Sequence, residues 1–308
     1  MTMPFDHVVS INDFSNEEIS HVFKIAEKML PSARGEVPSS ILDGKVLATL
    51  FFEPSTRTRL SFESAMHRLG GRVLGFSDPS GTSVVKGETL ADTIRMAEAY
   101  TDVIVLRHPR EGAARLASKF SNKPVLNAGD GAGQHPTQTL LDLFTILREK
   151  GDIQKQHVVL LGDLKYGRTV HSLAYALSRF GAEITLVSPK QLQMPEEITS
   201  YLSQNSTLHQ TESLEEAIED ADVLYVTRIQ KERFPDPAEY IQVAGMYRVD
   251  LKLLANAKKD TIVMHPLPRV NEVAPEVDSS DHARYFQQAF NGVPIRMALL
   301  SLVLGVEK

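Results

Sequence analysis

The sequence predicts an α/β protein made of two parallel-sheet domains. Short apolar runs alternate with longer amphipathic runs, which is the pattern of strands joined by crossover helices. A Gly-Asp break at 151–152 divides this alternation into two similar series. The chain has 308 residues, 42% of them hydrophobic, so it can bury two cores. We therefore expect two doubly wound, Rossmann-like domains.

The first series contains four apolar runs of strand length. They cover residues 46–52, 73–76, 103–107 and 125–127. After the first run, Pro54 stops the strand and Ser55 is placed to cap a helix with its hydroxyl. Leu60, Met66 and Leu69 are spaced for the buried side of that helix.

The second series contains four more such runs. They cover residues 157–162, 184–187, 223–228 and 262–265. An amphipathic helix over 135–150 lies between the two series, and an apolar helix over 294–306 ends the chain. We expect one domain over 1–134, with the C-terminal helix, about 290–308, packing back on it. The second domain then covers 151–285, and 135–150 is the interdomain helix.

Composition excludes several classes of function. The formal charge of -6 and the pI near 5.9 give no basic field for nucleic acid. The chain has no cysteine, which removes disulfides, thiol nucleophiles and thiolate metal sites. The N-terminus has no signal-peptide pattern and no apolar run is long enough to span a bilayer. We expect a cytoplasmic protein that binds neither nucleic acid nor membranes.

The stretch "FFEPSTRTRLSFE" places Arg57 and Arg59 in the first turn of the predicted helix. That turn is the positive end of the helix dipole, where acidic residues are favoured and arginine is not. The arrangement is unfavourable unless an anion binds there, so the position of Arg57 predicts a binding site for a small anion at the start of this helix. Arg59, on a different face, is expected to make structural ion pairs.

Other polar groups also follow predicted strands, where ligands of open parallel sheets bind. They are Arg107-His108-Pro109 and Gln134-His135-Pro136-Thr137-Gln138 in the first domain, and Arg168, Thr227-Arg228-Ile229-Gln230 and His265-Pro266-Leu267-Pro268-Arg269 in the second. Several arginines would thus converge on one active site in a cleft between the domains. This suits a substrate with several negative charges, such as phosphate and carboxylates.

These motifs resemble those of the aspartate/ornithine carbamoyltransferase family over most of the chain. The resemblance rests on "FFEPSTRTRLSFE", "VLRHPREGAARLA", "GDGAGQHPTQTLLDLFTI", "GDLKYGRTVHSL", "TRIQKER" and "MHPLPR", in this order. The last two are similar to the aspartate-specific branch, because ornithine-specific members carry a Cys-containing "HCLP". The resemblance implies attack of the L-aspartate amine on carbamoyl phosphate, a step of pyrimidine biosynthesis that needs no cofactor.

The resemblance also implies roles for individual residues. Carbamoyl phosphate is assigned to the domain over 1–134, with the phosphate held by Ser55, Thr56, Arg57 and Thr58. Thr58, Arg107 and His135 would polarise the carbamoyl oxygen, and Gln138 would fix the carbamoyl amide. The carbonyls of Pro266 and Leu267 would orient the carbamoyl NH2 or the attacking amine.

The domain over 151–285 is the one assigned to aspartate. Its carboxylates would be bound by Arg168, Arg228 and Gln230. The Leu267-Pro268 bond is a candidate cis peptide, also on the basis of the resemblance.

The loop "SDPSGTSVVKGETL" is rich in small polar residues and is expected to be exposed and mobile. Its family counterpart reaches into the active site of a neighbouring subunit, which implies a homotrimer with shared sites. Lys86 is the expected catalytic and aspartate-binding residue, and Ser83 the expected carbamoyl phosphate ligand, although Ser80 or Thr82 could take that place. The sequence leaves open whether a separate regulatory chain binds.

Each element also has a structural interpretation. Arg107 could pair with Asp102 and Arg228 with Asp222. His135 could be a buried structural histidine, His108 and His265 are expected to be structural or to support the site, and Lys86 could lie on a solvated turn.

Two motifs point weakly to nucleotides. "GDLKYGRT" has arginine where a P-loop needs lysine, and "GDGAGQ" lacks the last glycine of a dinucleotide fingerprint. No spacing of His, Asp and Glu indicates a metal site. The remaining alternative from another class is a non-catalytic scaffold that keeps the fold and binds anions.

Overall fold

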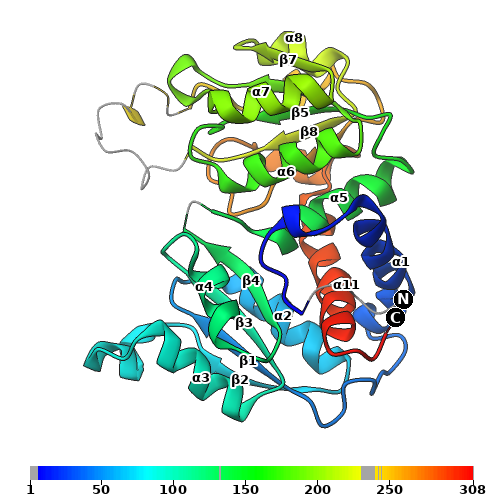
Figure 1. Cartoon of the computed structure of the whole chain (residues 1–308). Helices are drawn as coiled ribbons and strands as arrows, with labels where there is room; N and C mark the ends of the chain where they lie inside the picture. The colour runs from blue at the N-terminus through cyan, green and yellow to red at the C-terminus, as the bar shows by residue number, and fades with distance from the viewer. Residues whose placement is uncertain (1–5, 132, 230–239, 242, 244, 308) are drawn as a thin grey trace. The chain divides into compact units, whose positions relative to one another are not determined.

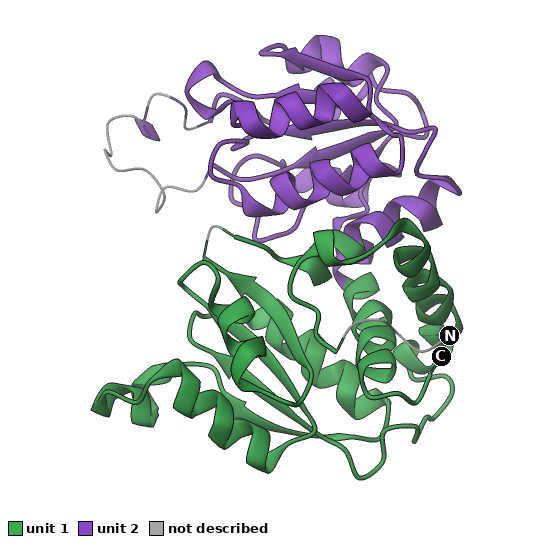
Figure 2. Cartoon of the chain, viewed as in Figure 1, with its two compact units in different colours: residues 1–141, 290–308 green, residues 142–289 purple. Residues whose placement is uncertain are grey.

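The computed structural model describes residues 6–131, 133–229, 240, 241, 243 and 245–307 (Figure 1). The chain forms two compact units (Figure 2). Unit 1 contains residues 1–141 and 290–308, and unit 2 contains residues 142–289. The unit boundaries therefore fall inside two helices, α5 (Pro136–Lys150) and α11 (Tyr285–Val303).

Unit 1 is built on a parallel sheet in the order β2-β1-β3-β4. Its strands are β1 (Val46–Phe51), β2 (Arg72–Phe76), β3 (Val103–His108) and β4 (Val125–Asp130). Crossover helices α2 (Thr56–Arg68), α3 (Leu90–Tyr100) and α4 (Ala113–Phe120) join them, preceded by η1 (Ile11–Asp13) and α1 (Asn16–Arg34). The interior strands β1 and β3 are almost wholly buried because helices cover both faces. The edge strand β4 is buried as well and forms an isolated parallel bridge between Leu126 and Val8, whereas the other edge strand, β2, is largely exposed.

Unit 2 is built on a parallel sheet in the order β7-β6-β5-β8-β9. Its strands are β5 (His157–Leu161), β6 (Glu183–Val187), β7 (Leu208–Thr211), β8 (Val223–Val226) and β9 (Ile262–Met264). Its helical segments are α6 (Arg168–Arg179), η4 (Lys190–Leu192), α7 (Glu196–Asn205), α8 (Leu214–Glu219), α10 (Leu251–Leu254) and η6 (Pro275–Ser279). The two parallel α/β sheets confirm the predicted fold class.

Three local predictions were wrong. Of the three residues predicted for the buried side of α2, Met66 and Leu69 are buried but Leu60 is 51% exposed, and Phe62 and Ala65 complete the buried face. Strand β7 was missed because it is a short edge strand with two exposed residues and no apolar run. Helix α11 begins at Tyr285 and carries Pro294 inside it, because its polar first turns do not stand out in an apolar pattern.

In the part of the chain that the structure describes, no helix is both long enough and apolar enough to cross a membrane.

Candidate active site

The carboxyl edge of the first sheet has a switch point between β1 and β3. The two strands are parallel neighbours, with Phe51 in register with Arg107, while β2 lies on the other side of β1. The connections after β1 and β3 therefore leave in different directions along the sheet. Open parallel sheets bind ligands at such points.

Helix α2 begins at this edge without a side-chain cap. Ser55 occupies the N-cap position, but its side chain makes no cap hydrogen bond, so the predicted hydroxyl cap is wrong. The first turn contains no acidic residue, Thr58 is buried, and Arg57 is exposed. Arg59 lies 3.8 Å from Glu63, the structural pair that was expected. An uncapped positive helix end with a cation beside it is suited to an anion such as phosphate.

Arg107 lies at the end of β3 with its guanidinium fixed by two contacts. It pairs with Glu53 at 2.9 Å and donates to the carbonyl oxygen of Ala128 at 3.0 Å. The alternative partner Asp102 lies 3.5 Å from Lys45 instead. Glu53 was within the quoted motif, yet its role was not predicted, because nothing local shows that the chain brings β3 beside it. The ion pair with Glu53 and the bond to the Ala128 carbonyl together fix the orientation of the guanidinium.

His135 is 5% exposed and directly precedes α5, where its carbonyl accepts from the backbone N–H of Gln138 at 2.9 Å. The turn before it is held by Asp130, a residue that the sequence analysis passed over. Asp130 accepts from Gly112 N at 2.9 Å and from Gln134 N and Asn127 Nδ2 at 3.0 Å each. These bonds fix the approach of the chain to His135.

The loop after β2 forms two short 3-10 helices, η2 (Pro79–Gly81) and η3 (Ser83–Lys86). Ser83 and Lys86 are both exposed, as predicted for this loop.

The carboxyl edge of the second sheet has its own switch point, between β5 and β8. These strands are parallel neighbours, and β8 pairs in turn with β9. Arg168 is the first residue of α6, where Gly167 at the N-cap provides no side-chain bond and no acid stands in the first turn. Arg228 follows β8 and, like Arg168, is half-buried. Gln230 lies outside the described residues.

The segment after β9 is the third strand end at this edge, after those that carry Arg168 and Arg228. The Leu267-Pro268 bond is cis, as predicted, and Leu267 has a φ of 56°. Its backbone N–H donates to His265 Nδ1 at 2.8 Å, and His265 Nε2 lies 2.8 Å from Glu272. Burial alone would raise the pKa of the Glu272 carboxyl, but the bonds from His265 and from backbone N–H groups outweigh it and lower that pKa.

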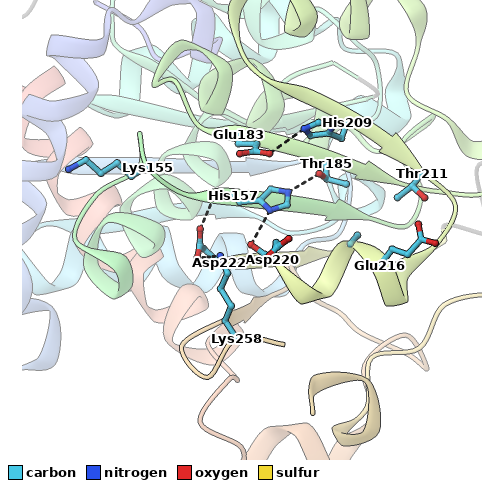
Figure 3. A pocket seen from close by; sticks show the side chains of 11 residues that line it. Lys155, His157, Glu183, Thr185, His209, Thr211, Glu216, Asp220, Asp222 and Lys258 are labelled. Carbon is cyan, nitrogen blue, oxygen red and sulfur yellow. Dashed lines mark hydrogen bonds and ion pairs between the residues drawn. The ribbon is translucent and has the colours of Figure 1, made fainter. Parts of the chain in front are cut away.

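A separate cavity of about 560 Å³ lies at the amino ends of β5 and β6, beside α8 (Figure 3). Two ion pairs lie within it: His209 is 3.3 Å from Glu183, and Lys258 is 3.0 Å from Asp222, the alternative partner considered for Arg228. No arginine lines it. This cavity is therefore not at the ligand-binding edge of the sheet.

Among the described residues, no group of three or more His, Cys, Asp or Glu side chains stands where it could hold a metal ion.

The chain is similar to carbamoyltransferases over nearly its whole length. The family model described as the aspartate/ornithine carbamoyltransferase carbamoyl-P binding domain matches residues 6–148, and the Asp/Orn binding domain matches residues 154–303. The aspartate carbamoyltransferase catalytic subunit of Methanocella arvoryzae is 59% identical over 303 residues, 98% of each chain. The Thermococcus gammatolerans subunit of the same name is 61% identical over 97% of each chain.

Solved structures agree with this. The catalytic subunit of M. jannaschii aspartate transcarbamoylase has a TM-score of 0.91 and 53% identity, and the match covers 97% of this chain and 98% of that one. Aspartate transcarbamoylase from Trypanosoma cruzi, solved with carbamoyl phosphate and aspartate, has a TM-score of 0.91 and 42% identity over 96% and 95% of the two chains. Fold, motifs and matched domains together show that this chain belongs to the aspartate/ornithine carbamoyltransferase family.

Proposed function

We propose that this protein transfers the carbamoyl group of carbamoyl phosphate to the amine of L-aspartate. The products are N-carbamoyl-L-aspartate and phosphate. The observation that carries the proposal is that each sheet has arginines at its switch point, beside a helix that begins with no acid and no side-chain cap. One such edge suits a phosphate, and the other suits a dicarboxylate.

The chemistry needs positioning and charge stabilisation more than a nucleophile. The nitrogen lone pair of aspartate attacks the carbonyl carbon, a C–N bond forms, and the tetrahedral intermediate expels phosphate as the C–O bond breaks. The amine loses its proton, and the leaving phosphate is the group able to accept it. No covalent bond to the enzyme is formed.

The phosphate is assigned to the start of α2. Its ligands there are the backbone and side chains of Ser55, Thr56, Arg57 and Thr58. The oxyanion that develops on the carbamoyl oxygen is assigned to Thr58, Arg107 and His135, and Gln138 holds the carbamoyl amide. Support comes from the buried Thr58 and His135 side chains and from the fixed guanidinium of Arg107.

Aspartate is assigned to the carboxyl edge of the second sheet. Arg168, Arg228 and Gln230 bind its two carboxylates, and the carbonyls of Pro266 and Leu267 orient the reacting nitrogen. Ser83 and Lys86 act in a neighbouring subunit of a cytoplasmic homotrimer, which accounts for their exposure within one chain.

The test is turnover by the purified chain with aspartate, with ornithine and with no acceptor, following carbamoylated product and phosphate separately. We expect both products only with aspartate. Thr58→Ala and His135→Ala should each lower kcat about 100-fold or more, since one oxyanion donor is worth about 3 to 4 kcal/mol. Ser61→Ala, which removes a hydroxyl that bonds back to Thr58 O within α2, is the matched control.

Other outcomes would redirect the proposal. Turnover that depends on ornithine would keep the anion site at α2 and overturn the acceptor. Absence of turnover with either amine would favour the scaffold alternative, and unchanged turnover in both variants would contradict the oxyanion assignment.

A further inference from the structure

A buried polar network lies beneath the carboxyl edge of the second sheet. Asp142 of α5 and Tyr225 of β8 have no exposed surface, and Gln288 of α11 is 1% exposed. Tyr225 donates its hydroxyl hydrogen to Asp142 Oδ2 at 2.8 Å, and Gln288 donates from Nε2 to Asp142 Oδ1 at 2.7 Å. One carboxylate thus joins three elements inside unit 2.

The network continues into the backbone of the His265–Leu267 segment. Gln288 Oε1 accepts from the backbone N–H of His265 at 2.8 Å, which also fixes which end of the amide faces Asp142. The His265 ring then accepts from Leu267 N through Nδ1, so its hydrogen is on Nε2 and points to Glu272. Every step from Asp142 to Leu267 has a defined donor and acceptor.

Each arm of the network ends close to a residue assigned to the substrates. Tyr225 is also hydrogen-bonded to the side chain of Thr169, which follows Arg168. Tyr225 itself stands near the end of β8, shortly before Arg228. The remaining arm ends at Leu267.

We propose that Asp142, Tyr225 and Gln288 form a positioning device that sets the Pro266 and Leu267 carbonyls for the reacting nitrogen. This inference rests on the proposed function, because that function gives the two carbonyls their role. Apolar packing holds groups close together, but hydrogen bonds also fix their orientation. The Gln288 amide orients the backbone N–H of His265, and this orientation sets the direction of the Pro266 and Leu267 carbonyls that follow. Burying a carboxylate is costly, so packing alone would favour apolar residues here.

The donor state of the network is stable over the working pH range. Burial raises the pKa of Tyr225 well above its usual value, and the negative charge of Asp142 raises it further. The phenol therefore remains protonated and continues to donate to Asp142.

The first variant is Tyr225→Phe in the full chain, which removes the hydroxyl and keeps the ring. We expect kcat with aspartate to fall about 10-fold, since small misplacements of reacting groups are costly. The inhibition constant for inorganic phosphate should not change, because the phosphate ligands lie at α2. Hydrogen exchange of the peptide spanning 265–268 should become faster. A loss of fold would instead change the inhibition constant for phosphate as well as kcat and hydrogen exchange.

The matched control is Thr185→Val. Thr185 is a buried residue of β6 whose hydroxyl lies 2.7 Å from His157 Nε2, beside the cavity of Figure 3. The Thr185→Val variant loses a comparable hydrogen bond in the same unit, but it should change neither kcat nor hydrogen exchange at 265–268.

A second pair of variants covers the case in which Tyr225→Phe folds poorly. Gln288→Glu keeps the acceptor for His265 but sets a carboxylate against Asp142, so kcat should fall more than 10-fold. Adding Asp142→Asn restores one donor between the two positions and should recover kcat to within about 3-fold of the wild type.

The inference fails if Tyr225→Phe leaves both kcat and exchange at 265–268 unchanged, or if the double variant shows no recovery. Hydrogen exchange is measured without substrate, so it tests the network even if the wild-type chain does not carbamoylate aspartate. Failure of the function and failure of the network are therefore separate results.

Discussion

Both units shape a turn at the carboxyl edge of their sheet with a buried carboxylate, but the two carboxylates act over different distances along the chain. Asp130 binds the groups of Gly112, Asn127 and Gln134, which lie 18, 3 and 4 residues away. Asp142 binds Tyr225 and Gln288, which lie 83 and 146 residues away. The first turn is thus held largely by its own neighbourhood, and the second depends on three elements packing correctly.

The two carboxylates also differ in the kind of donor that they meet. Two of the three partners of Asp130 are backbone N–H groups, which can only donate. The partners of Asp142 are side chains, and a hydroxyl can turn from donor to acceptor. A rigid local site and an adjustable distant one should therefore respond differently to the same substitution.

The two turns also differ in the type of residue that adopts the left-handed backbone conformation. Gly131, in the turn held by Asp130, has a φ of 51°, while Leu267 reaches a φ of 56° with a side chain. Glycine adopts this conformation without strain, whereas leucine does so at a cost that the surrounding structure must offset.

The largest effect is expected for Gly131→Ala, which should break the local turn. A Cβ there would lie 2.5 Å from Glu111 N and 2.9 Å from Pro109 O, both backbone atoms that cannot rotate away. Strain and overpacking together should lower the free energy of unfolding by about 3 to 5 kcal/mol. Urea unfolding at one fixed protein concentration measures this.

Gly112→Ala is the control for that variant. Gly112 also has a positive φ, of 78°, but a Cβ there would meet nothing within 4 Å. It should cost only about 1 to 2 kcal/mol, the strain of the left-handed backbone. Equal losses in the two variants would show that the tight contact with the Glu111 backbone is unimportant.

The comparison also shows what the sequence could predict. Strands β1, β3 and β4 and the position where α2 starts were predictable, because continuous apolar runs and the Ser-Thr-Arg turn are local patterns. The absence of a hydroxyl cap at Ser55 was not predicted. The strand-end rule then placed Arg57, Arg107, Arg168 and Arg228 at switch points, since the carboxyl ends of parallel strands share an edge.

The supporting contacts were not predictable in the same way. The Arg107 pair with Glu53 and the bonds of Asp142 join residues far apart in sequence, and a single chain gives no sign of which polar side chains will meet. Asp130 had a visible local signal, since it ends a strand and begins a Gly-rich turn. The predicted strand covered only 125–127, whereas β4 runs to Asp130, so the role of Asp130 at the strand end was missed.

Asp130→Asn should have the second largest effect. The asparagine oxygen can replace Oδ1, which accepts from Asn127 and Gln134, but its NH2 group then faces the backbone N–H of Gly112. Two opposed donors leave a buried group unsatisfied, so the free energy of unfolding should fall by about 2 to 3 kcal/mol. Asp43→Asn, at an exposed turn where Asp43 accepts from Gly44 N, should change it by less than about 0.5 kcal/mol. A similar loss in both would contradict the role given to Asp130.

Asp142→Asn should have the smallest effect of the three, although Asp142 is the more deeply buried carboxylate. The asparagine oxygen can still accept from Gln288, and its NH2 can donate to the Tyr225 oxygen if the Tyr225 hydroxyl hydrogen turns toward Thr169. Every group keeps a partner, so we expect the free energy of unfolding to change by less than about 1 kcal/mol. Urea unfolding beside Asp130→Asn makes the comparison direct. If Asp142→Asn cost as much as Asp130→Asn, the hydroxyl would not be able to reverse, and the distant network would be as rigid as the local one.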